Sequence, residues 1–485
     1  MEDTSPNPLM NDDLAPVPIE NRTWSSWNIA ALWIGMAVCI PTYMLAAGMV
    51  SQGMNWWQAT LTVMLGNMIV LIPMILNGHA GTKLGVPFPV LARASFGTTG
   101  AHVPSIARSL VACGWFGIQC WIGSAALYTI LGVLGIFDPS KDTTVLPILG
   151  ITGIQFASFM AFWLIHVVIV IRGVHCIKVL ETWAAPFLIA SGIALLIWAL
   201  LKVEQPSALF SSKTNYAQGT GFWKVFFPQL TAMVGFWATL SLNIPDFTRY
   251  SKSQKDQAVG QIIGLPPTMT LFCFIGIIVT GASVLIYGEA IWDPIELVSK
   301  MGSPTIVVLS MLTLLIVTLS TNLAANVVSP ANGFSNISPT KISFRLGALL
   351  TCSIGVLMMP WRLVNDMGAY IFTWLIGYSA LLGPIIGIML CDYFLISKTK
   401  IDTDELYNAT GSYKGIHWRA MIVLVIAILP NLPGFINAAT NTAGTDGAIF
   451  PDIFDSIYNY AWFVGVFVSV VLYWVLMQFT SSSND

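Results

Sequence analysis

The chain has 485 residues, a formal net charge of −2, 55% hydrophobic residues and 9% charged residues. Soluble domains carry about 25% charged residues, so this composition excludes an ordinary water-soluble enzyme. A total charge this close to zero gives no reason to expect a nucleic-acid partner.

Apolar runs recur along the whole chain at the length of a membrane span, which is about 20 residues for a hydrocarbon core about 30 Å thick. Because the runs are continuously apolar, they predict helices; a lipid-facing β-barrel would alternate polar and apolar residues. We therefore expect an all-α polytopic membrane protein of about twelve spans. The predicted spans are 27–52, 56–78, 103–131, 151–172, 175–201, 222–248, 257–287, 304–330, 342–358, 366–395, 417–438 and 457–478.

The placement of Lys and Arg predicts the orientation of these spans, since basic residues are enriched in cytoplasmic loops. With the N-terminus inside, fifteen of the 21 Lys and Arg residues fall on the cytoplasmic side. We therefore expect both termini in the cytoplasm and the chain in the inner (cytoplasmic) membrane. The polar, acidic first 25 residues do not have the pattern of a cleaved signal. The six basic residues on the other side are Lys141, Lys202, Lys213, Lys224, Lys300 and Arg362.

The first and sixth spans share a spacing that indicates an internal repeat. Trp33 is followed eight residues later by Pro41, Trp237 is followed eight residues later by Pro245, and the two pairs are 204 residues apart. The predicted orientation sends these two spans across the membrane in opposite directions. Two inverted copies of one helix bundle are common in secondary transporters, so the pattern predicts two five-span units related by inversion.

The prolines of this repeat also predict local unwinding. Proline removes a backbone donor, and Gly35 and Gly235 loosen the helix on the other side of each window. Unwound backbone inside a membrane is tolerated only beside protein or a water-filled cavity, where its carbonyls can bind ions or a solute. The alternative is a pair of simple proline kinks, which are common in membrane helices. The matched spacing favours a functional break.

In the third span, Trp115 and Gln119 are four residues apart and share one helix face. An indole offers stacking to a flat ring, and a side-chain amide matches a cyclic N–H/C=O edge. The alternative is that Trp115 is a packing residue and Gln119 joins two helices by a hydrogen bond. For an isolated pair, the sequence favours this alternative.

The eighth span carries the densest polar cluster in an apolar helix. Its hydroxyls, together with unwound carbonyls from the first span, would form the oxygen-only shell that a hard cation prefers. Alternatively, small residues allow close helix contacts, and Ser and Thr bond back to their own helix. Two asparagines on one face are harder to explain in this way, because each buried amide needs a partner. The polar residues are Ser320, Thr321, Asn322, Asn326 and Ser329.

Few ionisable groups lie near the spans. His166 is a possible proton carrier, but a histidine satisfied by its neighbours is favoured. Asp246, three residues before Arg249, is expected to form a structural pair or an inner gate with it, and Glu181 is expected at the interface beside Lys178. No HExxH, GxSxG or GxxxxGK[ST] motif occurs, so neither an enzyme nor an ATP-driven pump is supported. The seven cysteines lack CxxC spacing and are expected to be reduced packing residues.

With these residues in hand, the chain resembles the nucleobase-cation-symport-1 family, which includes bacterial hydantoin and allantoin permeases and fungal and plant purine, uracil and cytosine transporters. The resemblance is nearly full length, and NGHAGTK and NIPDFTR are most similar to the bacterial allantoin-permease branch. It rests on RTWSSWNIAALWIGM, IPTY, NGHAGTKLGVPFPVLARASFG, WFGIQCW, GFWATLSLNIPDFTRY, LSTNLAANVVSPA, MMPWRL and LLGPIIGIMLCDYFLI.

The resemblance implies a leucine-transporter-like fold with a 5+5 inverted repeat and two extra helices. This agrees with the repeat found in the first and sixth spans. The implied units are a cytoplasmic N-terminal segment at 1–26, the first five-helix repeat at 27–201, the second at 222–395, two additional helices at 396–478 and a cytoplasmic tail at 479–485.

The resemblance also implies where a substrate binds. In such relatives the substrate ring lies between two tryptophans that match Trp115 and Trp237, and amides that match Gln119 and Asn326 bind its edge. Gly235 and Phe236 fall beside this site. A hydantoin carrier has two glycines before the sixth-span tryptophan, whereas this chain has one glycine and then Phe236. The resemblance therefore leaves the identity of the heterocycle open.

The sodium site of the family, where present, uses backbone carbonyls of the first and eighth spans and two eighth-span hydroxyls. Both hydroxyls are retained here, so Na⁺ is the expected coupling cation, with H⁺ as the alternative because some relatives lose one hydroxyl. The matching positions are Gly35, Val38, Val317, Ser320 and Thr321.

The implied activity is import of a nucleobase or related planar heterocycle with a cation, by alternating access in the lipid bilayer, by a monomer. One alternative is a proton-coupled carrier of a vitamin or amino acid on the same fold. The lack of an ionised partner near the site argues against a zwitterion. The other alternative is a non-transporting receptor, which would need a signalling domain.

Overall fold

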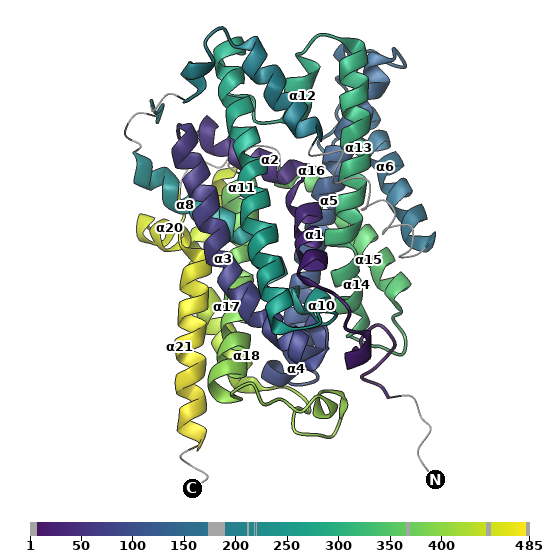
Figure 1. Cartoon of the computed structure of the whole chain (residues 1–485), viewed down its shortest axis with the longest axis vertical. Coiled ribbons are helices and arrows are strands. Elements are labelled where there is room, and N and C mark those ends of the chain that lie inside the picture. Colours follow the sequence, from purple (N-terminus) through teal and green to yellow (C-terminus); the bar gives the residue numbers. More distant parts are fainter. Residues whose placement is uncertain are drawn as a thin grey trace.

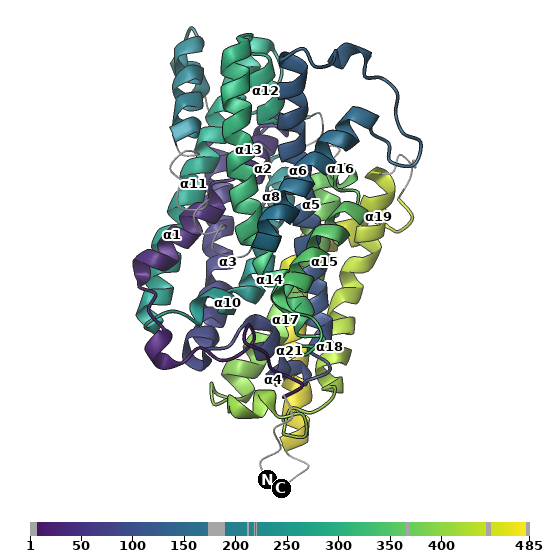
Figure 2. The ribbon, with the colours of Figure 1, turned by 90° about the vertical axis from the view of Figure 1, so that its right-hand side faces the viewer.

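The computed structural model describes residues 7–172, 190–210, 213–217, 219, 221–364, 369–442 and 448–481. In this part of the chain the regular structure is helical, apart from two isolated bridges. The long helices run along the longest axis of the molecule (Figure 1), and both termini lie at the same end of the bundle (Figure 2). The fold is therefore the all-α membrane architecture that the sequence predicts.

The described residues of the first half contain the helix pair α1 and α2 and the long helices α3, α5 and α6. Its elements are η1 (Ile19–Asn21), α1 (Ser26–Ala37), α2 (Ile40–Ser51), α3 (Trp56–Leu84), α4 (Phe88–Phe96), α5 (His102–Val133), η2 (Pro139–Lys141), α6 (Gly153–Arg172), the helix Ala190–Lys202 and η3 (Pro206–Phe210).

The second half contains more interruptions, including two π-helical segments, η4 and η5. Its elements up to the tenth predicted span are α8 (Phe222–Phe236), α9 (Ala238–Asn243), α10 (Pro245–Thr248), α11 (Gln254–Tyr287), α12 (Pro294–Ser299), α13 (Pro304–Asn326), α14 (Val328–Ser335), α15 (Phe344–Leu357), α16 (Pro360–Leu363), η4 (Ala369–Leu375), α17 (Ile376–Leu390) and η5 (Cys391–Ile396). The last elements are η6 (Asp404–Tyr407), α18 (Trp418–Ile428), η7 (Leu429–Asn431), α19 (Leu432–Thr442), α20 (Asp452–Tyr458) and α21 (Ala461–Ser481).

The observed helices agree closely with the predicted spans. Among the described residues, nine helices are long and apolar enough to cross a membrane, and the bent pair α1 and α2 makes a tenth span. The shorter apolar helices Ala190–Lys202 and α15 lie at the two remaining predicted positions. The start of the predicted span 175–201 falls outside the described residues, as do Cys176, Lys178 and Glu181.

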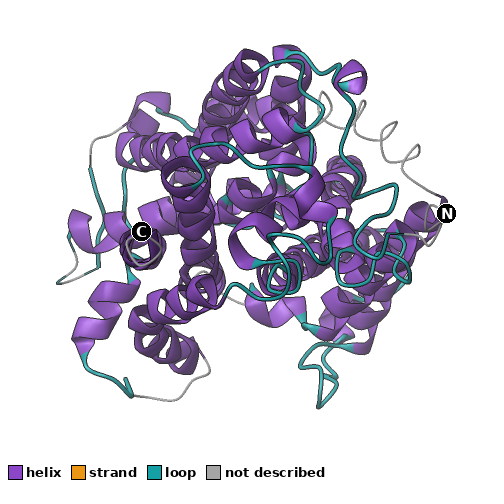
Figure 3. Ribbon diagram, turned by 90° about the horizontal axis from the view of Figure 1, so that it is seen from below, coloured by secondary structure: helices purple, strands orange, loops and turns teal. Residues whose placement is uncertain are grey.

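The helices form two packed groups. In one group, α11 packs against α1, α2 and α3, and in the other, α5 packs against α6, α13, α14 and α15. Seen from the end that carries the termini, helices also lie in the centre of the bundle (Figure 3). Loops, drawn in teal, cross this end. The two groups meet where α1 contacts α13 and where α9 contacts α5.

The first span breaks at Val38 and Cys39, where α1 and α2 meet at an angle of 59° (Figure 1). Pro41, in the first turn of α2, lacks the N–H that a continuous helix would direct to the carbonyl of Ala37. The N–H of Cys39 bonds to that carbonyl at 3.2 Å instead. The break that the Trp33–Pro41 spacing predicts is therefore present, just before the proline.

The sixth span is interrupted differently from the prediction. The helix breaks at Trp237 (φ −101°, ψ 3°), and α9 then continues to Asn243. Pro245 does not unwind the chain, because it occupies the first turn of α10, where its missing N–H needs no helical partner. The interruption of this span therefore lies at the tryptophan, eight residues before the proline.

Candidate functional site

A small cavity lies where the break in the first span faces α5, α8, α9 and α13. Its volume is about 30 Å³, which is room for roughly one water molecule. The structure brings together here five of the six residues predicted to bind substrate, and Thr321 from the predicted cation site. The lining residues are Met36, Cys39, Pro41, Trp115, Gln119, Phe236, Trp237, Thr239, Leu240, Thr321, Ala325 and Asn326.

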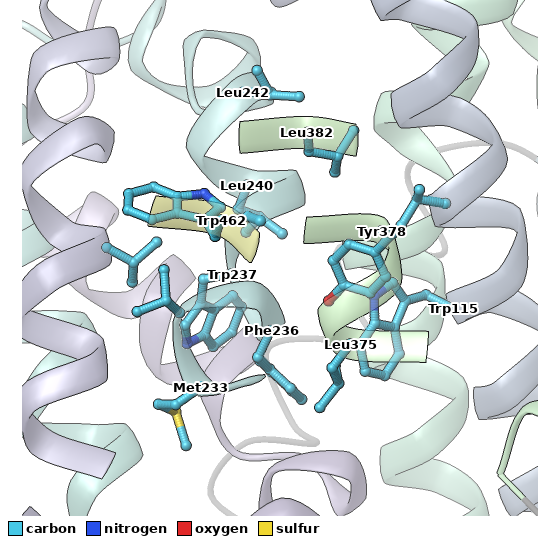
Figure 4. Packing of buried hydrophobic residues seen from close by; sticks show 14 of the residues in the cluster. Trp115, Met233, Phe236, Trp237, Leu240, Leu242, Leu375, Tyr378, Leu382 and Trp462 are labelled. Atoms are coloured by element: carbon cyan, nitrogen blue, oxygen red, sulfur yellow. The ribbon is translucent and has the colours of Figure 1, made fainter. Parts of the chain in front are cut away.

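Trp115 on α5 is the centre of an aromatic wall on one side of the cavity. Its ring centroid lies 5.1 Å from that of Phe236 and 5.9 Å from that of Trp374, both in edge-to-face geometry. Tyr378 lies beside it (Figure 4). Gly114 permits this packing, because a Cβ at this position would collide with the indole of Trp374. The wall therefore joins the third span to η4 and α17 of the tenth.

Phe236 occupies the space between the two tryptophans that were predicted to hold a substrate ring. Its centroid lies 5.1 Å from Trp115 and 5.0 Å from Trp237. Figure 4 shows its side chain projecting between the indoles of these residues. The phenyl ring thus lies between the two indoles and meets each of them in edge-to-face geometry. In this conformation the phenyl ring therefore fills the space between the indoles.

Trp237 is held firmly on the opposite side of the cavity. Its indole Nε1 donates to Oδ1 of Asn67 on α3 at 3.1 Å. Its ring also meets Trp33 edge-to-face at 5.2 Å. The two tryptophans that the 204-residue spacing pairs are therefore in contact, and both are buried.

The polar edge of the cavity is made of two side-chain amides. Gln119 is 3% exposed, and its Oε1 has no hydrogen-bond partner among the described residues. Asn326 donates its Nδ2 to Oδ1 of Asn322 at 3.0 Å. A buried carbonyl oxygen without a partner costs free energy unless it accepts a hydrogen bond. The site is therefore suited to a ring that carries N–H donors.

Gly235 does not line the cavity, in contrast to the other five predicted substrate residues. Its carbonyl oxygen accepts a hydrogen bond from the hydroxyl of Tyr378 at 2.8 Å. A Cβ on Gly235 would collide with the hydroxyl of Ser379. Gly235 therefore allows α8 to approach α17 closely, and its carbonyl holds the hydroxyl of Tyr378, which belongs to the aromatic wall.

The predicted cation ligands of the first span lie at its break. In a continuous helix the N–H of Cys39 would bond to the carbonyl of Gly35. Because it bonds to Ala37 instead, the Gly35 carbonyl loses its helical donor. Val38 ends α1 with ψ 81°, which turns its carbonyl out of the helical direction. Both carbonyls are thus available to a ligand, as a cation site requires.

The predicted cation ligands of the eighth span lie on the part of α13 that faces this break. Val317 and Val38 belong to one buried cluster. The hydroxyls of Ser320 and Thr321 make no hydrogen bond to any described residue, although Thr313 on the same helix bonds back to Leu309. These two hydroxyls therefore do not fit the alternative of back-bonding to their own helix. Among the described residues no cluster of His, Cys, Asp or Glu offers a competing metal site.

The expected pair between Asp246 and Arg249 is not formed. Asp246 accepts a hydrogen bond from the backbone N–H of Phe88 at 2.8 Å, and Arg249 donates to the carbonyl of Asp13 at 3.0 Å. The two side chains point to different neighbours, since the short α10 places one toward α4 and the other toward the N-terminal segment. Both residues instead tie α10 to the end of the bundle that carries the termini.

Sequence analysis missed a buried polar contact between α5 and α9. Arg108 on α5 is buried, and it donates through Nε and Nη2 to Oδ1 of Asn243 on α9 at 3.0 and 2.8 Å. An arginine near the end of a predicted span was counted only toward the orientation of the chain. Its position within that span, six residues into α5, was the signal for a buried partner.

Six of the seven cysteines lie in the described residues, and all six are buried and free, as expected of packing residues. Cys176 lies outside the described residues.

Comparisons with known proteins agree with this architecture. The family model described as permease for cytosine/purines, uracil, thiamine and allantoin matches residues 16–465. The purine-uracil permease NCS1 of Arabidopsis thaliana is 43% identical over 97% of this chain and 78% of its own length. The allantoin permease of Bacillus subtilis is 37% identical over 97% of this chain and 94% of its own length.

The solved transporter Mhp1 is similar over nearly the whole chain. Its inward-facing conformation matches with a TM-score of 0.79 and 25% identity, covering 98% of this chain and 95% of Mhp1. A closed conformation with bromovinylhydantoin bound, described as a nucleobase-cation-symport-1 family transporter, matches with a TM-score of 0.78 and 26% identity, covering 98% and 96%.

Proposed function

The chain belongs to the nucleobase-cation-symport-1 family of membrane permeases, and on this basis we propose that it imports a planar nitrogen heterocycle together with Na⁺. The substrate class is a nucleobase or a related ring such as allantoin, hydantoin, uracil or a purine. Its relatives are permeases and not enzymes, in agreement with the lack of catalytic motifs.

The observation that carries the proposal is the meeting of a freed backbone, two amides and two tryptophans at one buried cavity. Trp115, Gln119, Trp237 and Asn326 come from three different spans and line the same space. The freed carbonyl of Gly35 belongs to the adjoining break. A simple proline kink would not require unbonded hydroxyls on the facing helix.

The substrate half of the proposal rests on the chemistry of the cavity walls. Base stacking on an aromatic side chain contributes about 1–3 kcal/mol, and Trp115 and Trp237 supply the faces. The amide oxygen of Gln119, which has no partner among the described residues, supplies an acceptor for a ring N–H. Phe236 limits the space, so a substrate must displace its ring before both indoles can contact it.

The cation half rests on the freed carbonyl of Gly35 and on the hydroxyls of Ser320 and Thr321, which make no hydrogen bond to a described residue. Na⁺ prefers neutral and anionic oxygen ligands. The carbonyls of Gly35, Val38 and Val317 and the hydroxyls of Ser320 and Thr321 are the proposed ligands. Because α1 and α2 belong to one packed group and α13 to the other, a cation bound here would hold the two groups together.

The proposed mechanism is alternating access. Cation and substrate bind from one side, their joint binding permits closure, and the group of α1, α2, α3 and α11 rocks against the group of α5 and α13. One charge that crosses 100 mV supplies about 2.3 kcal/mol, which supports roughly fiftyfold accumulation. We place the termini in the cytoplasm, the chain in the inner (cytoplasmic) membrane as a monomer, and the direction of transport inward.

A thermal-shift panel on the purified protein tests the proposal. Uracil, hypoxanthine, hydantoin and allantoin are added with NaCl or with choline chloride at equal ionic strength. We expect at least one heterocycle to raise the melting temperature, and to raise it more with Na⁺, since bound ligands stabilise the folded state. No shift with any of them contradicts the substrate class. A shift that depends on pH and is indifferent to Na⁺ indicates a proton-coupled carrier.

A further inference from the structure

A buried chain of hydrogen bonds connects α6 to the cavity. His166 is 0% exposed and both of its ring nitrogens have partners, as the sequence analysis favoured. Nδ1 lies 3.0 Å from the carbonyl oxygen of Phe162, and Nε2 lies 3.1 Å from Nδ2 of Asn322. Oδ1 of Asn322 in turn accepts from Nδ2 of Asn326. The chain therefore reaches from a histidine outside the site to an amide on the cavity wall.

The direction of every hydrogen bond in this chain is fixed by two backbone carbonyls. The carbonyl of Phe162 can only accept, so the proton of His166 resides on Nδ1 and Nε2 is an acceptor. The carbonyl of Phe116 lies 3.1 Å from Nδ2 of Asn322 and also can only accept. Asn322 must therefore present its NH₂ group to both acceptors, and its Oδ1 faces Asn326.

The same logic sets the amide of Asn326. Because Oδ1 of Asn322 needs a donor, Asn326 presents its Nδ2 to it, and the Oδ1 of Asn326 has no partner among the described residues. Gln119 Oε1 is a second cavity oxygen without a partner in this part of the chain. The cavity thus offers two acceptors toward a ring.

We propose that His166 is a positioning residue that acts through Asn322 to hold the carbonyl of Asn326 toward the substrate, so that the carrier selects rings with an N–H donor at this edge. This inference rests on the proposed function and names the specificity of the same site. His166 itself does not touch the substrate. Without the Nε2 acceptor, only the carbonyl of Phe116 would hold the NH₂ group of Asn322, so the amides of Asn322 and Asn326 would be less firmly oriented.

The packing around His166 offers a variant that removes its nitrogens and keeps a ring. The imidazole contacts Phe116 and Phe162 edge-to-face, with centroids at 5.2 and 4.8 Å. Phenylalanine at this position keeps both contacts. His166→Phe therefore deletes the acceptor for Asn322 with little change in shape.

The test compares the affinities of uracil and cytosine for the purified full-length protein by isothermal titration calorimetry. Cytosine keeps the ring and the C2 carbonyl but has an acceptor at N3, where uracil has N–H. We expect the wild-type protein to favour uracil by about tenfold or more, since a wrong partner leaves buried groups unpaired. In His166→Phe the ratio is expected to fall to about threefold or less.

Four further variants separate positioning from general stability. Asn322→Ala breaks the same chain and is expected to lower the ratio equally, and the double variant should lower it no further, because both changes remove one pathway. His166→Gln, whose Oε1 can accept from Asn322, should restore the ratio. Ser158→Ala, a buried change on α6 outside the chain, should leave it unchanged.

Two results would overturn the inference in distinguishable ways. If the wild-type protein binds uracil better than cytosine and folded His166→Phe and Asn322→Ala keep that ratio, His166 has no positioning role and the proposed function stands. If His166→Phe does not fold, His166→Leu, which also lacks the acceptor for Asn322, takes its place in this comparison. If the wild-type protein binds none of uracil, cytosine, hydantoin and allantoin, both the proposed function and this inference are wrong.

Discussion

Trp115 combines two properties that a stacking platform requires, a ring at the cavity wall and a fixed orientation. Its edge contacts with Phe236, Trp374 and Tyr378 restrict the rotation of the indole. A platform that is already ordered loses little entropy when a ring stacks on it. Most of the stacking free energy can therefore appear as affinity.

Trp115→Ala is expected to weaken heterocycle binding by about 5- to 150-fold, which corresponds to the loss of about 1–3 kcal/mol of stacking. Calorimetric titration of the tightest ligand of the panel measures this effect. Trp223→Ala is the matched control, because Trp223 lies on α8 and is 63% exposed. Equal affinity of Trp115→Ala and wild-type protein contradicts the stacking role.

Phe236 is expected to set the size of the substrate. Phe236→Ala should remove the phenyl ring from between the indoles and raise the affinity for the two-ring purine hypoxanthine relative to uracil. Competition binding with both ligands measures the ratio. Phe227→Ala on the same helix, outside the cavity, should leave it unchanged. A ratio that Phe236→Ala does not alter shows that another group limits the space.

The hydroxyl of Thr321 is expected to bind the coupling cation. Thr321→Ala should remove most of the Na⁺-dependent part of the thermal shift while substrate alone still binds, because one of five oxygen ligands is lost. Thr313→Ala, whose hydroxyl bonds back to α13, should retain the Na⁺ effect. Gly35→Ala should also retain it, since a Cβ at Gly35 meets nothing within 4 Å and only the carbonyl is needed. Full Na⁺ stimulation in Thr321→Ala contradicts the assignment.

The broken first span is the structural unit on which both halves of the site depend. Pro41 prevents the Ala37 carbonyl from receiving its usual donor, and the resulting shift of the Cys39 N–H releases the Gly35 carbonyl. The break therefore couples a residue at the cavity wall to a ligand of the proposed cation site. A continuous helix would close the Gly35 carbonyl in its own hydrogen bond.

Pro41→Ala supplies the missing N–H and is expected to favour a continuous helix. The Na⁺-dependent thermal shift should fall strongly, and ligand affinity with it. Pro73→Ala is the control, because Pro73 lies inside the continuous helix α3 and has no role at the site. Pro73→Ala is expected to keep the wild-type Na⁺ effect, and retention of the full effect in Pro41→Ala as well contradicts this account of the break.

Sequence reasoning predicted the helices well because membrane spans are defined by a strong and simple signal, a continuous apolar run of fixed length. It also located the first break, since a proline in such a run acts on the helix directly. The break at Trp237 could not be predicted from the position of the proline. Proline position alone does not distinguish a kink from the first turn of a new helix, and Pro245 proved to be the latter.

The candidate site was predicted only in part because side-chain direction depends on tertiary contacts. The shared face of Trp115 and Gln119 followed from helical spacing, but the phenyl ring of Phe236 between the indoles did not. The prediction that Asp246 and Arg249 pair was wrong for the same reason, since each side chain bonds to a different neighbouring segment. The link from His166 to Asn326 joins α6 to α13 and has no sequence signature.

The arrangement of the two helix groups explains how one site can face two sides of a membrane. The cavity lies at their contact, and its lining side chains Trp115, Gln119 and Asn326 are at most 7% exposed. Movement of one group against the other would open the site toward one end while contacts such as Arg108 with Asn243 close the other.

The most direct test of the account is uptake of radiolabelled substrate, the tightest ligand of the panel, into proteoliposomes. With an inward Na⁺ gradient and an inside-negative potential of 100 mV, we predict accumulation well above the external concentration, abolished by a sodium ionophore and by Trp115→Ala. Uptake that never exceeds the external concentration, or that follows a proton gradient and ignores Na⁺, would contradict Na⁺-coupled import.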